Sequence, residues 1–583
     1  MSDLLNSASL VMIPSGYAED KVYSAVPTDG SGDLSFTRAS NGTRINSAGL
    51  VEVVPWNLAE QSETFDNVAW VKTTDGQVTI SANATTAPNG TLTADKMIAS
   101  AISGFHCVAQ TQSLVAGVFT ISIYAKASEY TFLQIFDSLT TDFANFNLTT
   151  GAVATVDTYT ATIENVGNGW YRCTATKTNP SGNFVFRYGI VTTGTATRGE
   201  SFTGNGVNGL FIWGAQLNIG ATAKPYFPTT DRLNVPRLTY QNGGGGCPSL
   251  LLEKQSTNLV QYSEQFDNAG WTKSDVTISA NNTTSPDGTQ NADKIISNTT
   301  NARHIIYQAF TVGVSTYTFT TYAKAGGNSF LIMRLDTDVP EVKTWFNLSN
   351  GTIGTSEGGS PSITSVGNGW YRCSVQFVSS ASQVVYAVFY TATTDGNTNF
   401  AGNGTDGTFA WGAQLEASSY PTSYIPTTSA SATRVADACF KTGISSLIGQ
   451  TEGVLFVDVD FYSNTGEIGI FIEIGDGSGT NRVLIYYSST TILCYANASV
   501  FSYTQSTSER LKIAFAYKSG NSALYVNGVQ KAVSSSALTY SSLSQLNIGS
   551  QFSFAQTTFS PTREAILFPT RLTNAELASL TTI

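Results

Sequence analysis

Charged side chains are scarce in this chain. Asp, Glu, Lys and Arg together make up 12% of its 583 residues, about half the usual globular share. The 30 Lys and Arg against 41 Asp and Glu give a formal net charge of −11, and no run of basic residues occurs. Binding to nucleic-acid phosphates needs clustered basic groups, so the composition argues against a nucleic-acid partner.

The chain also lacks metal-type cysteine spacing and long apolar runs. Its six cysteines are scattered, and no stretch approaches the roughly 18 apolar residues of a membrane span. Cys173 and Cys373 occupy matching points of the repeat described below, so we expect buried free thiols, as in a protein folded in a cytoplasm. The opening MSDLLNSASLVMIPSG has no signal-peptide pattern, so we expect release by cell lysis if the protein acts outside a cell.

Catalytic motifs are missing as well. No GxSxG, HExxH or phosphate-cradling glycine motif is present, and the two histidines, His106 and His304, are interpreted as structural residues that do not align in the repeats. Asp458 and Asp460 in FVDVDF alternate onto one strand face, as a pair of hydrolase carboxylates would, but the run itself offers no third acidic residue in register. We therefore expect no enzyme and no catalytic residue.

What the chain does have is a duplication: two copies of about 170 residues, whose matching phrases are offset by 198 to 201 residues. A shared series of phrases recurs in the same order in both copies, so this is a whole-domain repeat and not a short solenoid. The matching phrases are NLAEQSETFDNVAW and NLVQYSEQFDNAGW, ISANATTAPNGTLTADK and ISANNTTSPDGTQNADK, YAKA twice, FNLTTG and FNLSNG, VGNGWYRC twice, and WGAQL twice.

Each copy alternates apolar and polar residues in short runs separated by Asn-Gly or Asp-Gly turns, which predicts antiparallel strands with one buried face. We therefore predict an all-β fold of tandem antiparallel β-sandwich (jelly-roll) domains followed by a different, lectin-like β-sandwich. Near the end, Thr573 or Asn574 can cap a helix over NAELASL. The predicted parts are a lead-in and virion-attachment segment 1–55, copy one 56–230, a glycine-rich linker 231–257, copy two 258–430 and the C-terminal sandwich 431–583.

Several phrases resemble known families. LLLEKQSTNLVQYSEQFDNAGW, GNGWYRC and WGAQLEASSYPTSYIPTT are similar to carbohydrate-binding-like jelly-roll modules of bacteriophage tail-fibre and other virion proteins, and SFTRASNGTRINSAGLVEV resembles the phrase that often precedes them. FAYKSGNSALYVNGVQ and REAILFPTRLTNAELASL resemble a concanavalin-like (laminin G-like) domain. The resemblance implies a place on the phage particle and possible glycan binding.

Candidate binding residues follow from differences between the copies. Sugar sites combine an exposed aromatic ring with a few polar groups, and duplicated core positions tend to match. Trp345 stands where copy one has Asn145, so we predict a glycan site at Trp345 with Arg334 and Asp336 beside it. The tryptophans of GNGWYRC and WGAQL are instead interpreted as core residues, with the arginine of GNGWYRC paired at the rim.

A metal site is a weaker hypothesis. Calcium is possible at GDGSGTN, where Asp476 and Asn481 offer oxygen ligands, but an ordinary glycine turn fits these residues better, and we expect no other cofactor.

The sequence thus predicts a tail or head fibre that binds host surface polysaccharide through non-catalytic sandwiches. A homotrimer, implied by the resemblance, would add avidity, with other virion proteins as partners and no membrane insertion. The alternative is a purely structural collar, capsid-decoration or baseplate component that binds no glycan. A depolymerase is the third possibility, and it lacks an acid–base constellation.

Overall fold

The computed structural model describes residues 2–72, 77–114, 117–137, 141–179, 182–336, 341–462, 468–505, 507–550 and 561–583. The chain forms two compact units. One comprises Met1–Val54, Leu233–Asp287 and Asn291–Ile583, and the other comprises Pro55–Arg232 and Gly288–Gln290. The second unit, which contains copy one, therefore interrupts the sequence of the first. No helix among the described residues is long and apolar enough to cross a membrane.

Copy one is a sandwich of two antiparallel sheets, as predicted. Its apolar side chains alternate inward to form one core, which includes Trp70, Phe119, Phe146 and Phe186. The first sheet has the order β10 (Cys107–Leu114), β17 (Gly182–Val191), β12 (Phe132–Asp137), β13 (Phe143–Asn147) and β14 (Ala152–Asp157). The second has the order β15 (Thr160–Gly167), β16 (Trp170–Asn179), β11 (Gly117–Lys126), β19 (Gly209–Ile219), β8 (Ala94–Ala99) and β7 (Val78–Thr85), and the short pair β9 (Ser103–Phe105) and β18 (Ser201–Thr203) lies apart.

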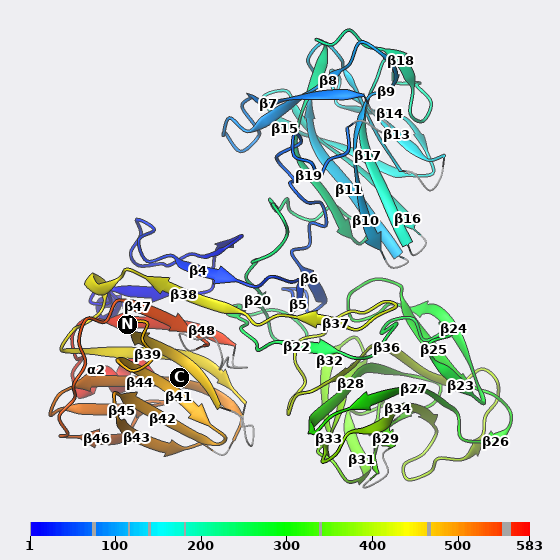
Figure 1. Cartoon of the computed structure of the whole chain (residues 1–583). Coiled ribbons are helices and arrows are strands. Elements are labelled where there is room, and N and C mark those ends of the chain that lie inside the picture. Colours follow the sequence, from blue (N-terminus) through cyan, green and yellow to red (C-terminus); the bar gives the residue numbers. More distant parts are fainter. Residues whose placement is uncertain are drawn as a thin grey trace. The chain divides into compact units, whose positions relative to one another are not determined.

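Copy two repeats this arrangement around a core with Trp271, Phe319, Phe346 and Phe389 (Figure 1). Its first sheet has the order β23 (Thr272–Ser274), β27 (Ile305–Val312), β34 (Gln383–Ala392), β29 (Phe330–Asp336), β30 (Val342–Asn347) and β31 (Thr352–Glu357). Its second has the order β24 (Val276–Thr283), β25 (Ala292–Ser297), β36 (Gly407–Glu416), β28 (Ser315–Gly326), β33 (Trp370–Ser379) and β32 (Ser362–Gly367). Two short pairs complete it, β26 (Asn301–Ala302) with β35 (Phe400–Ala401) and β22 (Ser256–Asn258) with β37 (Ala432–Arg434).

The C-terminal sandwich is built from more than its own segment. One sheet contains β46 (Val529–Ser534), β45 (Ser522–Val526), β44 (Glu509–Lys518), β39 (Glu452–Phe461), β48 (Thr562–Phe568), β21 (Ser249–Leu250), β20 (Leu238–Thr239) and β1 (Leu10–Met12). The other contains β43 (Ser499–Thr504), β42 (Thr491–Ala496), β41 (Arg482–Ser488), β40 (Ile468–Gly475), β47 (Gln545–Ile548), β38 (Ala438–Thr442), β4 (Leu34–Thr37), β3 (Lys21–Val22) and β2 (Tyr17–Ala18). Short α1 (Ser2–Leu5), the 3₁₀ turn η1 (Ser445–Leu447) and α2 (Asn574–Thr581) are the helical elements of the described residues.

The lead-in and the expected linker thus differ from what the sequence suggested. In Figure 1 the blue β4 runs beside the yellow β38, and Ala438 is in register with Thr37. The segment 231–257 contributes β20 and β21, because its apolar residues are buried against β48. Only its glycine run matches a linker: Gly243–Gly246 all have positive φ, and a Cβ on Gly244 would lie 2.6 Å from the nitrogen of Gly49.

A short hairpin precedes each sandwich module. β5 (Gly42–Ile45) pairs with β6 (Val51–Val54) before copy one, and β20 pairs with β21 before copy two. Each hairpin region carries an arginine–glutamate pair: Arg44–Glu52 at 2.8 Å and Arg237–Glu253 at 2.6 Å. The duplication therefore extends upstream of the phrases that revealed it.

The histidines were interpreted wrongly as unaligned. His106 Nε2 lies 2.9 Å from the carbonyl of Phe202, and His304 Nε2 lies 2.9 Å from that of Phe400, with both rings buried. The two positions are 198 residues apart and are equivalent in the copies. Each side chain ties backbone segments together, so the structural interpretation itself holds.

Other core expectations are confirmed. Trp170 and Trp370 are buried, and each Nε1 donates to a backbone carbonyl at 3.1 Å. Cys173 and Cys373 are fully buried free thiols. Thr573 caps α2 and forms a reciprocal capping box with Glu576.

Candidate functional site

Five buried charged residues meet where the lead-in, the segment 231–257 and the segment after copy two converge. They are Arg38, Arg237, Glu253, Arg434 and Asp437, and all their side chains are fully buried. Arg237 and Arg434 contact Glu253 at 2.6 and 3.1 Å, while Arg38 contacts Asp437 at 3.0 Å and Arg237 also binds Asp437. Buried charges persist only when paired in this way, so the cluster fixes these three segments to one another.

The cluster holds Glu253 ionised. Burial alone raises the pKa of Glu253, but Arg434, Arg237 and hydrogen bonds from Ser423 outweigh burial and hold that pKa at about 2. Ser423 donates to this carboxylate from its amide at 2.7 Å and from its hydroxyl at 2.6 Å. Burial lowers the pKa of Arg38 to about 10, so Arg38 keeps its charge at neutral pH. Three arginines against two carboxylates leave the cluster with one net positive charge.

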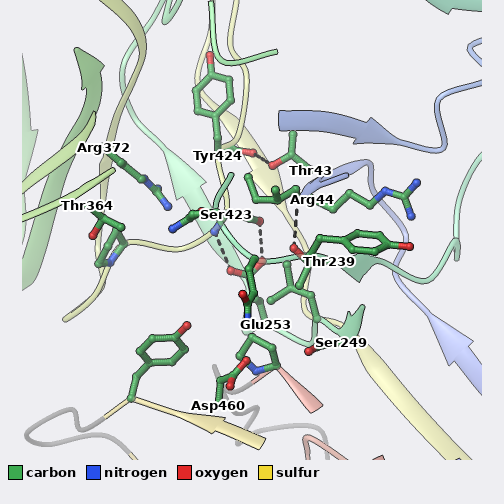
Figure 2. A pocket seen from close by; sticks show the side chains of 18 of the residues that line it. Thr43, Arg44, Thr239, Ser249, Glu253, Thr364, Arg372, Ser423, Tyr424 and Asp460 are labelled. Carbon is green, nitrogen blue, oxygen red and sulfur yellow. Dashed lines mark hydrogen bonds between the residues drawn. The ribbon is translucent and has the colours of Figure 1, made fainter. Parts of the chain in front are cut away.

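A cavity of about 580 Å³ opens beside this cluster. Figure 2 shows Arg372 and Thr364 on one side, Arg44 and Thr43 on another, and the hydrogen-bonded Glu253 and Ser423 between them. The volume falls within the range of ordinary ligand pockets, roughly 300 to 1,000 Å³. The floor is buried, while the rim is exposed and polar; the rim residues include Gln241, Asn242, Ser362, Thr364, Tyr462 and Ser508.

One wall is the outer face of β32 and β33. Alternation along β33 turns Arg372, Ser374 and Gln376 to the same side of the sheet. Ser362 is in register with Ser374, their hydroxyls lie 2.7 Å apart, and Thr364 is in register with Arg372. The sequence gives this strand face polar residues, because it points away from the core of copy two.

The facing wall comes from the C-terminal sandwich. Asp460 near the end of β39 accepts from Arg563 of β48 at 2.7 Å, and Tyr462 follows with 40% of its surface exposed. Asp458 instead forms a bidentate pair with Arg510. Both carboxylates considered as a hydrolase pair are therefore engaged by arginines.

Tyrosines contribute to the apolar part of the lining, beside aliphatic and proline side chains. Tyr462 exposes its ring at the rim and Tyr240 is partly exposed, while Tyr322, Tyr420 and Tyr424 are buried in the walls. Aromatic faces together with hydroxyl, amide and guanidinium donors can bind a polar ligand with apolar faces. Among the described residues, no group of three or more His, Cys, Asp or Glu is placed to hold a metal ion.

The predicted glycan residues lie elsewhere, and Trp345 is not exposed. Only 1% of Trp345 is accessible, its Nε1 donates to the carbonyl of Asn397 at 3.1 Å, and it packs with Ile332 and Tyr390. The segment between β34 and β35 covers this outer face of the sheet, so a side chain outside the main core is still buried. An exposed aromatic platform at Trp345 is therefore wrong.

Arg334 lies beside this covered layer. Its Nη1 donates to the hydroxyl of Tyr390 at 2.7 Å, and its Nε lies 2.9 Å from Glu341. The side chain of Asp336 falls outside the part of the chain that the structure describes. Neither Arg334 nor Trp345 lines the cavity.

Asp476 and Asn481 form a hydrogen-bonded turn. Asp476 accepts from the amide of Ser478 at 2.8 Å and from Asn481 Nδ2 at 3.1 Å, while Asn481 Oδ1 accepts from Asn497. Hydrogen bonds to Ser478 lower the pKa of Asp476. The oxygens proposed as calcium ligands are thus engaged within the turn.

Sequence reasoning missed the cavity because its walls come from segments far apart in the chain. One available signal was the comparison of IENVGNGWYRC with ITSVGNGWYRC, in which Glu164 is replaced by Thr364 opposite the arginine of the motif. A second was the buried glutamate of LLLEK, which is unusual inside an apolar run.

No protein-family model matches the chain, and no curated protein matches it in sequence. Solved structures with similar β-sandwich domains include the CBM40 module of the Ruminococcus gnavus IT-sialidase bound to α2,3-sialyllactose. That match has 11% identity and a TM-score of 0.21, and covers 24% of this chain and 86% of the module. The CBM22-1–CBM22-2 tandem of Paenibacillus barcinonensis Xyn10C matches with 10% identity and a TM-score of 0.21, over 61% of this chain and 96% of the tandem.

Domains LG4-5 of the mouse laminin α1 chain match with 9% identity and a TM-score of 0.17, over 47% of this chain and 90% of theirs. The all-β sandwich class stands on the strand pairing described above. At such TM-scores the similarity does not bear on what the chain binds.

Proposed function

We propose that this chain is a structural protein of a bacteriophage particle, a tail or head fibre, that binds glycans on the host cell surface without cleaving them. The observation that carries the binding part is the cavity of about 580 Å³ lined by tyrosines, hydroxyls, amides and arginine. Sugars offer both hydroxyl groups and apolar ring faces, which match such a lining. The virion part is supported by the resemblance of the repeat phrases to phage appendage modules.

The proposed activity is adhesion without chemistry. The carboxylates Asp458 and Asp460 are each held by an arginine, and both histidines are bonded to backbone carbonyls. A homotrimer on the particle, with other virion proteins as neighbours, would present three such sites and raise the effective affinity.

The test is binding of the purified full chain to host cells and to their extracted surface polysaccharide, with product sizes measured after long incubation. We expect saturable binding with unchanged polysaccharide length. Absence of binding would favour a purely structural collar, decoration or baseplate component. Shortened polysaccharide would overturn the non-catalytic part of the proposal.

A substitution at the rim tests whether the glycan binds in the cavity. Tyr462→Ala removes an exposed ring from the cavity and is expected to weaken glycan binding about tenfold, a change of ~1.4 kcal/mol. Tyr386→Ala is the matched control, because Tyr386 is also 40% exposed but lies on copy two away from the cavity. Equal effects of the two substitutions, measured by titration calorimetry, would exclude the cavity as the binding site.

A further inference from the structure

Arg372 is unusual among the charged residues that line the cavity. Arg44 is paired with Glu52 at 2.8 Å, Arg563 with Asp460 at 2.7 Å, and Glu253 with the buried arginines. Arg372 forms no ion pair with any residue that the structure describes. Its Nη2 donates to the carbonyl of Thr422 at 2.6 Å, and its buried Nε has no partner among those residues.

The equivalent arginine of copy one, Arg172, has a different cross-strand neighbour. Arg172 has the same surroundings: its Nη2 donates to a backbone carbonyl at 2.7 Å, and its guanidinium lies 5.5 Å from the ring of Tyr124, as that of Arg372 lies 5.5 Å from Tyr322. In copy one the residue in register with Arg172 is Glu164. In copy two the residue in register with Arg372 is Thr364.

This exchange changes the charge of the face. Residues directly opposite on antiparallel strands have their Cβ atoms about 5 Å apart, so Glu164 puts a negative charge near Arg172, although the two side chains form no ion pair within 4.0 Å. Thr364 cannot do this for Arg372. The copy whose face lines the cavity is therefore the copy that lacks the cross-strand carboxylate.

The charged groups around Arg372 do not neutralise its positive charge. The one net positive charge of the five-residue cluster is offset by the buried Glu416, which accepts from the amide and hydroxyl of Thr422 at 2.9 and 2.6 Å. The Arg44–Glu52 and Arg563–Asp460 pairs are neutral, so Arg372 is left as the uncompensated charge of the lining. A cavity of positive charge in a chain with a net charge of −11 is suited to an anionic ligand group. A guanidinium binds a carboxylate with two parallel hydrogen bonds, which a neutral sugar cannot accept in the same way.

We propose that the cavity binds a saccharide bearing a carboxylate, such as a uronic or sialic acid residue, and that Arg372 contacts this carboxylate. This inference rests on the proposed glycan binding and specifies the class of sugar. The tyrosines and the hydroxyl groups of the rim would contact the sugar ring, while Arg372 would distinguish acidic from neutral residues.

The decisive variant gives copy two the cross-strand glutamate that copy one has. Thr364→Glu places a carboxylate opposite Arg372, and Thr364 is exposed, so the substitution is tolerated by the fold. Thr364→Gln has nearly the same size without the charge. Glu164→Thr makes the reverse change in copy one, where Glu164 is not a lining residue of the cavity.

The full chain and these variants are titrated with 3′-sialyllactose and oligogalacturonate, with their carboxyl-reduced forms, and with maltohexaose as a neutral glycan. We expect at least one acidic probe to bind, its carboxyl-reduced form to bind at least tenfold more weakly, and Thr364→Glu to weaken the acidic probe at least tenfold. Glu164→Thr is expected to stay within about twofold of the unaltered chain. Thr364→Gln removes a rim hydroxyl and is expected to weaken acidic and neutral probes alike and less than Thr364→Glu weakens the acidic probe, and raising the salt concentration is expected to weaken binding.

Three results would overturn the inference about sugar class: binding of neutral or carboxyl-reduced probes alone, equal binding of acidic and reduced probes, or unchanged binding by Thr364→Glu. In each of these results the glycan-binding function would stand. If no probe bound and host polysaccharide did not bind either, the proposed function itself would fail.

Discussion

The two sandwich modules share a fold and differ in how their outer faces are used. In copy one, Gln134 and Asn145 lie under the segment after β17 and bond to each other at 2.7 Å. In copy two, Ile332 and Trp345 occupy the same register positions and make an apolar layer. The duplicated strands thus accept either a polar network or an apolar cluster at one place, because the same connection covers both. The duplication preserves the strand arrangement, and a residue that differs between the copies is not for that reason part of a binding surface.

The largest expected effect concerns the charge cluster, which involves residues of the first unit only. Glu253→Ala leaves Arg237 and Arg434 without their shared carboxylate, and we expect a loss of about 3 to 5 kcal/mol in the unfolding free energy of that unit. The transition of the unit that contains copy one should not move. Scanning calorimetry of the full chain separates these outcomes.

Two companion variants control that measurement. Glu253→Gln keeps the shape and should fall between the alanine variant and the unaltered chain. Glu129→Ala removes the partly exposed pair with Lys96 and a hydrogen bond from the amide of Gly209 in copy one, for which we expect about 1 kcal/mol. Comparable losses for Glu253→Ala and Glu129→Ala would contradict the role given to the cluster.

The next largest expected loss of stability distinguishes the covered sheet face of copy two from that of copy one. Trp345→Ala opens a cavity in the apolar layer of copy two and should cost about 3 kcal/mol or more. Asn145→Ala in copy one leaves Gln134 with fewer partners and should cost about 1 to 3 kcal/mol. Urea unfolding measures both, and glycan binding by the folded Trp345→Ala variant should be unchanged. Loss of binding without loss of stability would restore Trp345 as a contact residue.

A further expected effect is a pH dependence of stability that differs between the copies. Burial and the nearby Asp287 raise the pKa of Glu264 in copy two to about 8, whereas copy one has Asn89 at the position of Asp287. The folded state then holds a proton that the unfolded chain releases near pH 4.5, so the free energy of unfolding should fall as the pH rises from about 4.5 to 8.

Asp287→Asn makes copy two resemble copy one in this respect. It should lower the pKa of Glu264 and flatten the pH dependence of the first unit, as followed by urea unfolding at pH 5, 6.5 and 8. A dependence that keeps its slope in Asp287→Asn and in Glu264→Gln would show that other groups cause it.

Sequence patterns predicted the fold class and the repeat because these depend on local alternation and on turn residues that recur. The same patterns could not place Leu10 beside Leu567 or Leu250 beside Thr562, since strand pairing between distant segments leaves no periodic mark. The cavity depends on several such pairings at once. Trp345 was misjudged because the connection that covers it is a loop whose path no local pattern specifies.

The pairing of β1 with β48 sets an order of events during synthesis. Ser9 donates to the carbonyl of Leu567, 558 residues later, so β1 has only its local bridge between Val11 and Val26 until β48 has left the ribosome. Domains fold as units as the chain emerges, and copy one is available long before that moment. Leu10–Met12 therefore gain their sheet partner only after β48 is made, and a nascent chain cut short before β48 leaves β1 with the bridge to Val26 alone.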